Sequence, residues 1–311
     1  MQLRIVFLGT SGSIPSVNRN HCSIFIQFGS YRFLFDCGEG TQKQMMIAKT
    51  GFRNLDHIFI THLHTDHYIG LFGLLETMSL NEREKPLYIY APNAEILRHV
   101  FEVLGYDKLN YEVNVKELKD GDEIKFKDFK ILAFKTEHIV PSLGYALIEK
   151  DRRGKFDREK AEKVLGIPPG PLYSKLARGE SIVWNGKVIT PDMVLGEKRK
   201  GRKIVYTGDT RPCNRTVEVA RDADVLIHDS SFTSDLIDWA VESGHSTARE
   251  AAEIAKRANV KKLILTHISA RYSKDVTPLL KEAKEVFENV LIAEDFMSLE
   301  VRYEEVIVCS T

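Results

Sequence analysis

The stretch Thr61-His62-Leu63-His64-Thr65-Asp66-His67 decides the fold. Four potential metal ligands stand within six residues, and an apolar run at 57–61 comes directly before them. A strand that ends in a loop lets alternate side chains converge on one point, whereas a regular helix would spread them at this spacing. Because imidazole and carboxylate groups are suitable zinc donors, the stretch predicts a metal site at the end of a β-strand.

Other histidines and acids repeat this placement along the chain. His138 follows the apolar run 129–137, and Asp209, His228-Asp229 and His267 end the segments KIVYTGD (203–209), ADVLIHD (223–229) and KKLILTH (261–267). Open α/β sheets place their sites at the carboxyl ends of strands, so we expect these side chains to meet. His57 precedes its strand and His99 lies in a helical run, so neither is expected to be a ligand. For His21, a loop and a core position both stay open.

The order of elements indicates an α/β fold in one domain, residues 1–311. Strands are expected at 3–8, 22–28, 31–36, 57–61, 87–91, 111–118, 124–127, 129–135, 145–149, 203–207, 224–228, 262–266 and 290–294. Helices are expected at 40–48, 68–80, 213–221, 246–257 and 275–287. Strands come first and then alternate with helices, in two halves, which predicts a four-layer αββα sandwich.

Composition gives no global argument for a nucleic-acid partner. The 311 residues include 44 basic and 44 acidic side chains, and the 43% of apolar residues suffices for a large core. Cys22, Cys37, Cys213 and Cys309 are scattered, which is typical of free thiols in a reducing compartment. The chain shows neither a signal peptide nor an apolar run of about 20 residues, so we expect a cytoplasmic protein without a membrane partner.

The segment 150–178 interrupts the pattern. It is polar and basic, and its middle is rich in Pro and Gly. Residues 150–203 hold 15 Lys and Arg against 7 Asp and Glu, a local charge of +8, which leaves −8 for the rest of the chain. A solvated surface helix with a loop is the plain interpretation. Because the segment lies between two metal-site motifs, we expect an insertion that projects from the body and has a functional role.

Taken together, these motifs resemble the metallo-β-lactamase superfamily, whose signature is H-x-H-x-D-H followed by further His, Asp and His. Over essentially its whole length the chain is also similar to the ribonuclease Z family, the tRNA 3′-processing endonucleases. The segments that carry this resemblance are FLGTSGSIP (7–15), FDCGEGTQ (35–42), HLHTDH (62–67), GPLYSKL (170–176), YTGDTRPC (206–213), HST (245–247) and LTHISARY (265–272).

The sequence departs from the family pattern at three places. Thr65 stands where the family often has Gly. The family loop P-x-K-x-R-N, linked to handling of the CCA end, appears at 15–20 as PSVNRN without its lysine. The family segment H-E-A-T appears at 228–231 as HDSS, with an acid one methylene shorter.

The resemblance implies two zinc ions per chain, a pair that can make water nucleophilic and clamp a phosphate. It assigns His62, His64 and His138 to one ion, Asp66, His67 and His267 to the other, and Asp209 to both. Asp66 is expected also to orient the attacking water. His245 is the expected general acid, with Asp229 holding its tautomer, although a place beside the cap of the following helix explains His245 equally well without the resemblance.

The implied reaction removes the 3′ trailer from precursor tRNA and leaves a 3′-hydroxyl on the tRNA and a 5′-phosphate on the trailer. The resemblance makes 150–178 an inserted flexible arm that grips the tRNA, with one subunit's arm serving the other subunit of a homodimer. Its expected contacts are Lys150, Arg152, Arg153, Lys155, Arg158 and Lys160. Arg271 and Tyr272 could bind a phosphate, or could be plain surface residues.

Two other functions remain open. One keeps the metal ions but changes the substrate, as in a small-molecule phosphodiesterase or a thioesterase of the same fold. The other is a non-enzymatic RNA-binding module with a degenerate site.

Overall fold

The computed structural model describes residues 1–309, without the side chain of Asp107. These residues form two compact units, one made of Met1–Ile148 with the segment from Arg202 onward, and the other of Glu149–Gly201. We describe each unit by itself.

The larger unit contains two sheets within the described residues. The first has eight strands in the order β17 (Val306–Cys309), β16 (Ser298–Val301), β1 (Leu3–Gly9), β2 (Ser23–Phe28), β3 (Tyr31–Phe35), β4 (His57–Phe59), β5 (Leu87–Ala91) and β6 (Val113–Glu117). The second has seven, in the order β15 (Val290–Ile292), β14 (Leu263–Thr266), β13 (Val225–Asp229), β12 (Lys203–Tyr206), β9 (Leu143–Glu149), β8 (Phe129–Lys135) and β7 (Glu123–Lys125). In each sheet four neighbouring strands are parallel, β3 to β6 and β12 to β15, and the strands beside them pair antiparallel.

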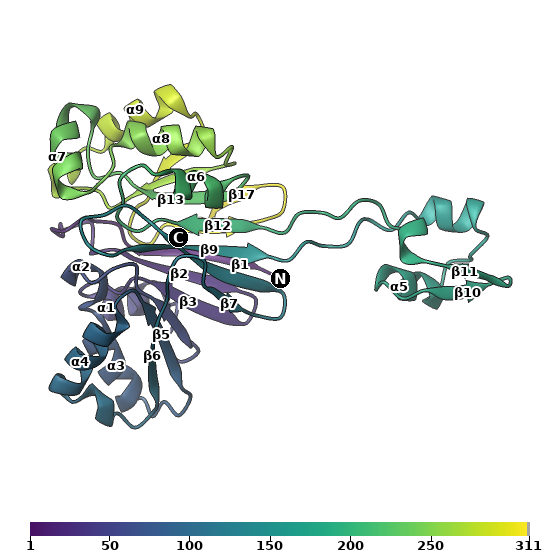
Figure 1. Ribbon diagram of the computed structural model, residues 1–311, viewed down its shortest axis with the longest axis horizontal. Helices are drawn as coiled ribbons and strands as arrows, with labels where there is room; N and C mark the ends of the chain where they lie inside the picture. The colour runs from purple at the N-terminus through teal and green to yellow at the C-terminus, as the bar shows by residue number, and fades with distance from the viewer. Residues whose placement is uncertain (310–311) are drawn as a thin grey trace. The chain divides into compact units, whose positions relative to one another are not determined.

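Helices cover the outer face of each sheet (Figure 1). The first sheet packs against α1 (Thr41–Ile47), α3 (Leu71–Leu80) and α4 (Ala94–Leu104), and the short α2 (Thr65–Tyr68) precedes α3. The second packs against α6 (Asn214–Ala220), α8 (Ala248–Arg257) and α9 (Thr277–Val286), and α7 (Ile237–Ser243) precedes α8. This is the helix–sheet–sheet–helix layering that the sequence predicts.

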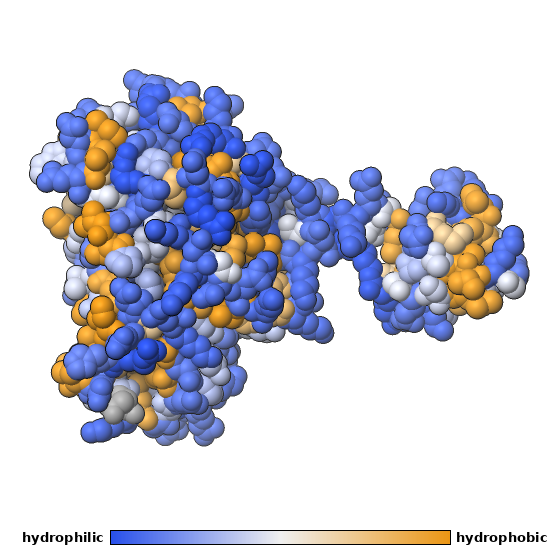
Figure 2. Space-filling view, in the orientation of Figure 1, coloured by the Kyte–Doolittle hydropathy of each residue, from blue (hydrophilic) through white to orange (hydrophobic). Residues whose placement is uncertain are grey.

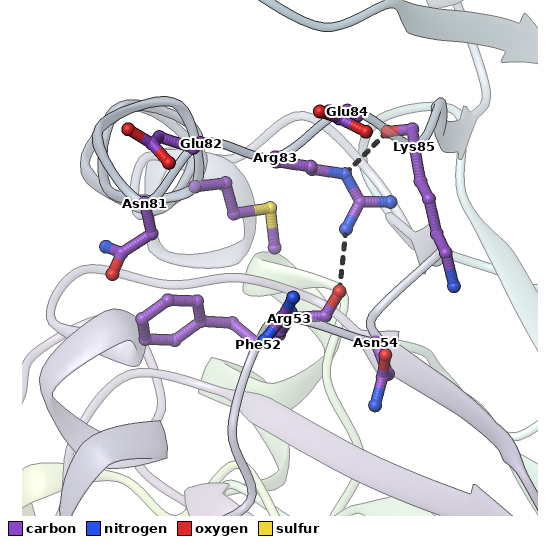
Figure 3. A pocket seen from close by; sticks show the side chains of 9 residues that line it. Phe52, Arg53, Asn54, Asn81, Glu82, Arg83, Glu84 and Lys85 are labelled. Carbon is purple, nitrogen blue, oxygen red and sulfur yellow. Dashed lines mark hydrogen bonds between the residues drawn. The ribbon is translucent and has the colours of Figure 1, made fainter.

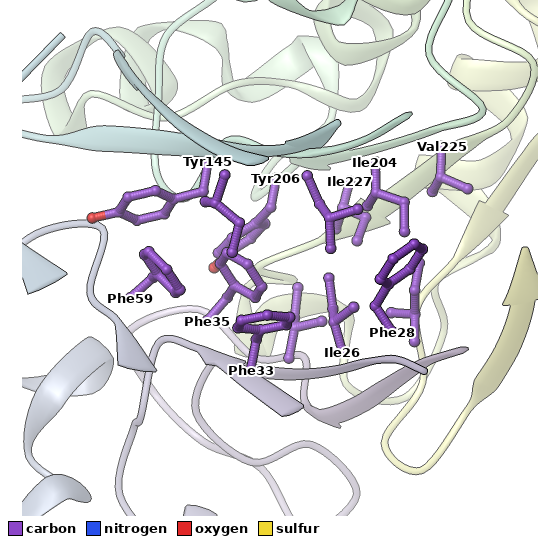
Figure 4. Packing of buried hydrophobic residues seen from close by; sticks show 14 of the residues in the cluster. Ile26, Phe28, Phe33, Phe35, Phe59, Tyr145, Ile204, Tyr206, Val225 and Ile227 are labelled. Carbon is purple, nitrogen blue, oxygen red and sulfur yellow. The ribbon is translucent and has the colours of Figure 1, made fainter. Parts of the chain in front are cut away.

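The alternation of side chains along the strands builds these layers. In β12, Ile204 and Tyr206 enter the cluster between the sheets, whereas Val205 faces the helices. Since successive side chains of a strand point to opposite faces, a strand buried on both faces must be apolar throughout. Aromatic rings from both sheets fill the middle, where Phe59 lies 5.2 Å from Phe35 and 5.2 Å from Tyr145 between ring centroids (Figure 4).

The smaller unit has its own apolar cluster. It contains a π-helical turn η2 (Lys160–Val164), the helix α5 (Pro171–Ala177), the hairpin β10 (Ile182–Trp184) and β11 (Lys187–Ile189), and the 3₁₀ turn η3 (Pro191–Met193). The sequence predicts an insertion over 150–178, but the compact unit extends to Gly201. The reason is that Ile182 and Ile189 of the hairpin complete the same cluster as Ala161 and Leu176. Apolar side chains also gather on part of this unit's visible face (Figure 2).

Some elements differ from the sequence prediction. The helix expected at 68–80 is two helices, α2 and α3, and the first of them already includes Asp66 and His67. Strands β16 and β17, the β10–β11 hairpin and helix α7 were not predicted, because segments of three to seven residues show too little periodicity.

Truncation of Phe59 tests the central cluster. We expect Phe59→Ala to lower the free energy of unfolding by about 3–5 kcal/mol, since the fully buried ring would leave a cavity between the sheets. Urea denaturation would measure the change. The control Ile96→Ala removes a side chain that is 56% exposed and should change stability by less than about 0.5 kcal/mol. A loss below about 1 kcal/mol for Phe59→Ala would contradict this account of the core.

Candidate metal centre

Five strands deliver polar side chains to one edge of the sandwich. β4, β8, β12, β13 and β14 are each followed or ended by a candidate residue, in the order His62, His138, Asp209, Asp229 and His267. The structure groups these side chains so that one ligand atom from each lies within 4.8 Å of the others in its group. The groups are His62, His64, His138 and Asp209, then Asp66, His67 and His267, then Asp209, Asp229, His245 and His267.

The first group surrounds one point. His62 Nε2 lies 3.0 Å from His64 Nδ1, and His138 Nε2 lies 3.3 Å from the same His64 nitrogen. Asp209 Oδ2 is 3.6 Å from His62 Nε2. Burial holds the pKa of His62 well below its ordinary value, and it also lowers the pKa values of His64 and His138. The three rings are therefore neutral imidazoles, the form that binds a metal ion.

The second group shares Asp209 with the first. The Nε2 atoms of His67 and His267 both lie 3.2 Å from Asp209 Oδ2. Asp66 Oδ2 is 3.5 Å from His67 Nε2 and 3.6 Å from His267 Nε2. Asp209 thus stands between the two groups.

The donor atoms fit cations. Among the described residues, Asp66 Oδ2, His67 Nε2, Asp209 Oδ1 and His267 Nε2 are buried without a hydrogen-bond partner. Buried polar atoms without partners are costly, and four of them aimed into one small region indicate a site for ions. Burial opposes the charged form of Asp209, yet the neighbouring histidines hold its pKa well below the ordinary value, so the carboxylate stays ionised. The donor set of imidazoles and carboxylates suits zinc.

His245 and Asp229 form a pair beside the second group. His245 Nδ1 lies 2.9 Å from Asp229 Oδ2, so the acid reaches the ring although it is one methylene shorter than the family's glutamate. Burial favours the neutral ring, but the Asp229 carboxylate outweighs it and raises the pKa of His245 to about 9. The ring planes of His245 and His267 are stacked with centroids 4.8 Å apart. Asp229 therefore favours the protonated form of His245 at the edge of the metal centre.

The other predicted residues fall into two sets. Arg271 and Tyr272 belong to the turn η5 (Ala270–Tyr272), which begins three residues after His267, and Arg271 is exposed. The arm residues Lys150, Arg153, Lys155, Arg158 and Lys160 are exposed in the smaller unit, and Arg152 there is half-buried. Their roles stay predictions.

Two cavities of the larger unit differ in their chemistry. One of about 640 Å³ is lined by His138, Ile139, Arg211, Val241 and Gly244, and so opens beside the metal centre. Another of about 790 Å³ lies between the loops around Arg53 and Arg83 (Figure 3). There the Arg83 guanidinium is engaged by the backbone oxygens of Arg53, Lys85 and Pro86 and by Asp56. The second cavity brings together no candidate catalytic residue.

Comparison with known proteins gives the family. The family model for Anti-Pycsar protein Apyc1 matches residues 3–154, and that for the β-lactamase superfamily domain matches residues 183–268. A ribonuclease Z of Archaeoglobus fulgidus is 74% identical over 305 residues, which cover 98% of this chain and 100% of the relative. That of Methanosarcina acetivorans is 54% identical over 302 residues, covering 97% and 99%.

The chain belongs to the ribonuclease Z family.

Solved structures agree with this family. Human tRNase Z, short form, is 29% identical with a TM-score of 0.66, covering 95% of this chain and 98% of its own. The metallo-β-lactamase fold protein YhfI from Bacillus subtilis, 21% identical, shares the fold with a TM-score of 0.70 and coverages of 96% and 99%. The expected metallo-β-lactamase fold and the resemblance to the ribonuclease Z family are confirmed. As a member of that family, the chain is an endoribonuclease, a phosphodiester hydrolase.

The sequence analysis missed Asp36, which positions the segment 61–67 of this ribonuclease Z family member. The fully buried Asp36 accepts from the Thr61 backbone N–H at 2.7 Å, and its Oδ2 accepts from the Tyr206 hydroxyl at 2.7 Å. The same Oδ2 lies 2.8 Å from His67 Nδ1, which turns His67 Nε2 toward the metal centre. The segment FDCGEGTQ (35–42) includes Asp36, and an acid at a strand end was the signal that could have found it.

Two further contacts position the histidines. His267 Nδ1 lies 2.9 Å from Ser231 Oγ, which in turn donates to Asp229 Oδ1 at 2.8 Å. His138 Nδ1 lies 2.9 Å from the backbone oxygen of Gly244. In each case a contact at Nδ1 leaves Nε2 for a metal ion.

Replacement of Asp36 tests its positioning role. We expect Asp36→Asn to weaken zinc binding by about 10–100-fold, because the amide lacks the negative charge that orients His67. Competition with a chelator of known affinity would measure the loss. The control Asp120→Asn changes a surface carboxylate that pairs with Arg215, and it should leave zinc affinity unchanged. Equal affinity in the wild type and Asp36→Asn would refute the role.

Proposed function

We propose that this endoribonuclease removes the 3′ trailer from precursor tRNA with two zinc ions, leaving a 3′-hydroxyl on the tRNA and a 5′-phosphate on the trailer. The observation that carries the proposal is the convergence of seven family ligands at one edge, with Asp209 shared between two groups. The sequence identity to ribonuclease Z proteins, which extends over nearly the whole chain, supports tRNA as the substrate. No helix within residues 1–309 is long and apolar enough to cross a bilayer, and their four cysteines are all free thiols. We propose a cytoplasmic location from the free thiols, which are typical of a reducing compartment.

The zinc ligands follow the two groups. His62, His64 and His138 would hold one ion, Asp66, His67 and His267 the other, and Asp209 both. When bound, two such ions supply a water that ionises near neutral pH and positive charge for the phosphoryl oxygens. Asp66, whose Oδ2 lies near the Nε2 atoms of His67 and His267, would also orient the attacking water.

In this proposal His245 donates a proton to the leaving group. Asp229 holds the Nδ1 side of His245 at 2.9 Å, which leaves Nε2 as the nitrogen that donates. The raised pKa keeps His245 protonated at neutral pH, so it can protonate the departing 3′-oxygen. The loop that carries His245 is fixed by Arg211, which donates to the His245 backbone oxygen and pairs with Glu250. Glu250 and Thr247 form the capping box of α8 two residues farther on.

Substitution separates the proton donor from the ligands. We expect His245→Ala to reduce turnover by about 10²–10⁴-fold while zinc content is unchanged, because only proton donation is lost. Cleavage of a 3′-extended precursor tRNA and metal analysis of the same sample would test this. The matched variant Asp209→Ala should lose zinc and activity together, since it serves both ions. Loss of zinc from His245→Ala would instead make His245 a ligand.

The smaller unit is proposed to grip the tRNA. Its exposed basic residues and its net charge of +5, from 13 Lys and Arg against 8 Asp and Glu over 149–201, suit the phosphates and 2′-hydroxyls of an RNA helix. Lys150, Arg152, Arg153, Lys155, Arg158 and Lys160 are the proposed contacts. In a homodimer, which we propose from the family, the unit of one subunit would serve the metal centre of its partner.

Removal of this unit tests the RNA function against a small-molecule phosphodiesterase. Lys203 of β12 pairs with Ile148 of β9, so a short Gly-Ser turn can replace residues 149–201. We expect the shortened protein to lose precursor cleavage by at least about 100-fold and to keep hydrolysis of a chromogenic phosphodiester, because it keeps the metal centre but loses the phosphate contacts.

Two outcomes would count against the proposed roles. Unchanged precursor cleavage after the deletion would mean that the unit does not bind tRNA. Mixing the shortened protein with full-length Asp209→Ala should restore cleavage if one subunit's unit serves its partner, and failure to restore it would contradict the shared dimer.

A further inference from the structure

An exposed tryptophan and an arginine stand together, and the ring of Phe232 links them to His245. The Arg271 guanidinium lies over the Trp239 ring, with its Cζ 5.3 Å from the ring centroid, and 5.7 Å from that of Phe232. The Phe232 ring centroid is 6.3 Å from that of His245. Trp239, Arg271 and Phe232, named here the aromatic platform, therefore extend outward from the proposed proton donor.

The platform is free to receive a ligand. Trp239 is 53% exposed, which is unusual for so large an apolar ring. Within residues 1–309, the Arg271 guanidinium makes no hydrogen bond and no ion pair, although carboxylates are abundant in the chain. Its charge is met only by the faces of two aromatic rings. Neither side chain has a structural partner that would explain its exposure.

Hydrogen bonds hold the platform in place. The Tyr272 hydroxyl, next to Arg271, accepts from the Thr233 backbone N–H at 3.0 Å and lies 2.6 Å from the Thr233 hydroxyl. The backbone N–H of His245 donates to the oxygen of Ala240, the neighbour of Trp239, at 2.8 Å. The turn η5, the helix α7 and the His245 loop are thus tied together, so the platform keeps its place beside the metal centre.

We propose that the aromatic platform binds the unpaired nucleotide whose 3′-oxygen leaves in the reaction, with its base stacked on Trp239 and a flanking phosphate paired to Arg271. Aromatic faces accept any base by stacking, and a guanidinium held on such a ring keeps its N–H groups for phosphate oxygens. The inference rests on the proposed function. It names this nucleotide because His245 donates to the 3′-oxygen, and the platform begins at His245.

A double-mutant cycle between Trp239 and the base tests the inference. Precursor tRNA is made in three forms: intact, abasic at the last retained nucleotide, and abasic at the first trailer nucleotide. In the wild type, loss of the retained base should lower kcat/KM by about 5- to 100-fold. Trp239→Leu should lose a similar factor with the intact precursor and no further factor with that abasic one, because each change removes the same contact.

Controls make every outcome informative. Trp239→Phe keeps an aromatic face and should restore most of the loss, whereas a merely structural role would be met equally well by Leu. The trailer abasic form should lower kcat/KM equally in wild type and Trp239→Leu. Additive losses at the retained base, or coupling to the trailer base instead, would overturn the inference. Failure of the wild type to cut the intact precursor would overturn the proposed function itself.

Discussion

Buried negative charge at the edge of the sandwich is the constraint on which the rest of the structure depends. Asp36, Asp66 and Asp209 lie within a few ångströms of His67, and Asp36 and Asp209 are at most 2% exposed. Several buried nitrogen and oxygen atoms of these histidines and aspartates have no hydrogen-bond partner. Bound cations would provide a partner for all of them. The fold therefore has to bring carboxylates and imidazoles from five strands to one edge. It also has to hold the carboxylates there against their repulsion of one another.

The layered packing of the fold keeps these side chains in place. The candidate ligands follow strands that are apolar on both faces. Each of these strands packs on one face against the central cluster and on the other against a layer of helices. The backbone is also constrained at the site itself. Asp36 and His267 have φ values of 57° and 58°, a left-handed conformation that costs energy for residues with a side chain. That cost is offset by the hydrogen bonds of Asp36 to Thr61 and Tyr206 and by the contact of His267 with Ser231.

The sequence predicted which side chains converge better than it predicted what holds them in place. His62, His138, Asp209 and His267 follow long apolar runs, and the rule that sites lie at strand ends is enough to bring them together. Asp36 escaped because its role depends on a backbone turn and on Tyr206, which is 170 residues away. The extent of the smaller unit escaped because the hairpin residues Ile182 and Ile189 show their purpose only when packed against α5. Contacts that are distant in sequence, and strands of three residues, leave no periodic trace.

On the proposed function, the distribution of charge gives a neutral chain a way to select RNA. The smaller unit, residues 149–201, carries +5, so the larger unit carries −5, including the carboxylates of the metal centre. A body of negative charge repels phosphates at long range, and the proposed zinc ions, together with the guanidinium of Arg271, would oppose this repulsion at the site. An RNA that binds only the smaller unit, or only the metal centre, gains one favourable contact to set against this repulsion. An RNA that spans both gains two that are linked through its own rigid structure, and the second contact then forms at high effective concentration. On the proposed function, discrimination follows from shape: the substrate is the molecule that carries an unpaired 3′ segment at the right distance from a helix.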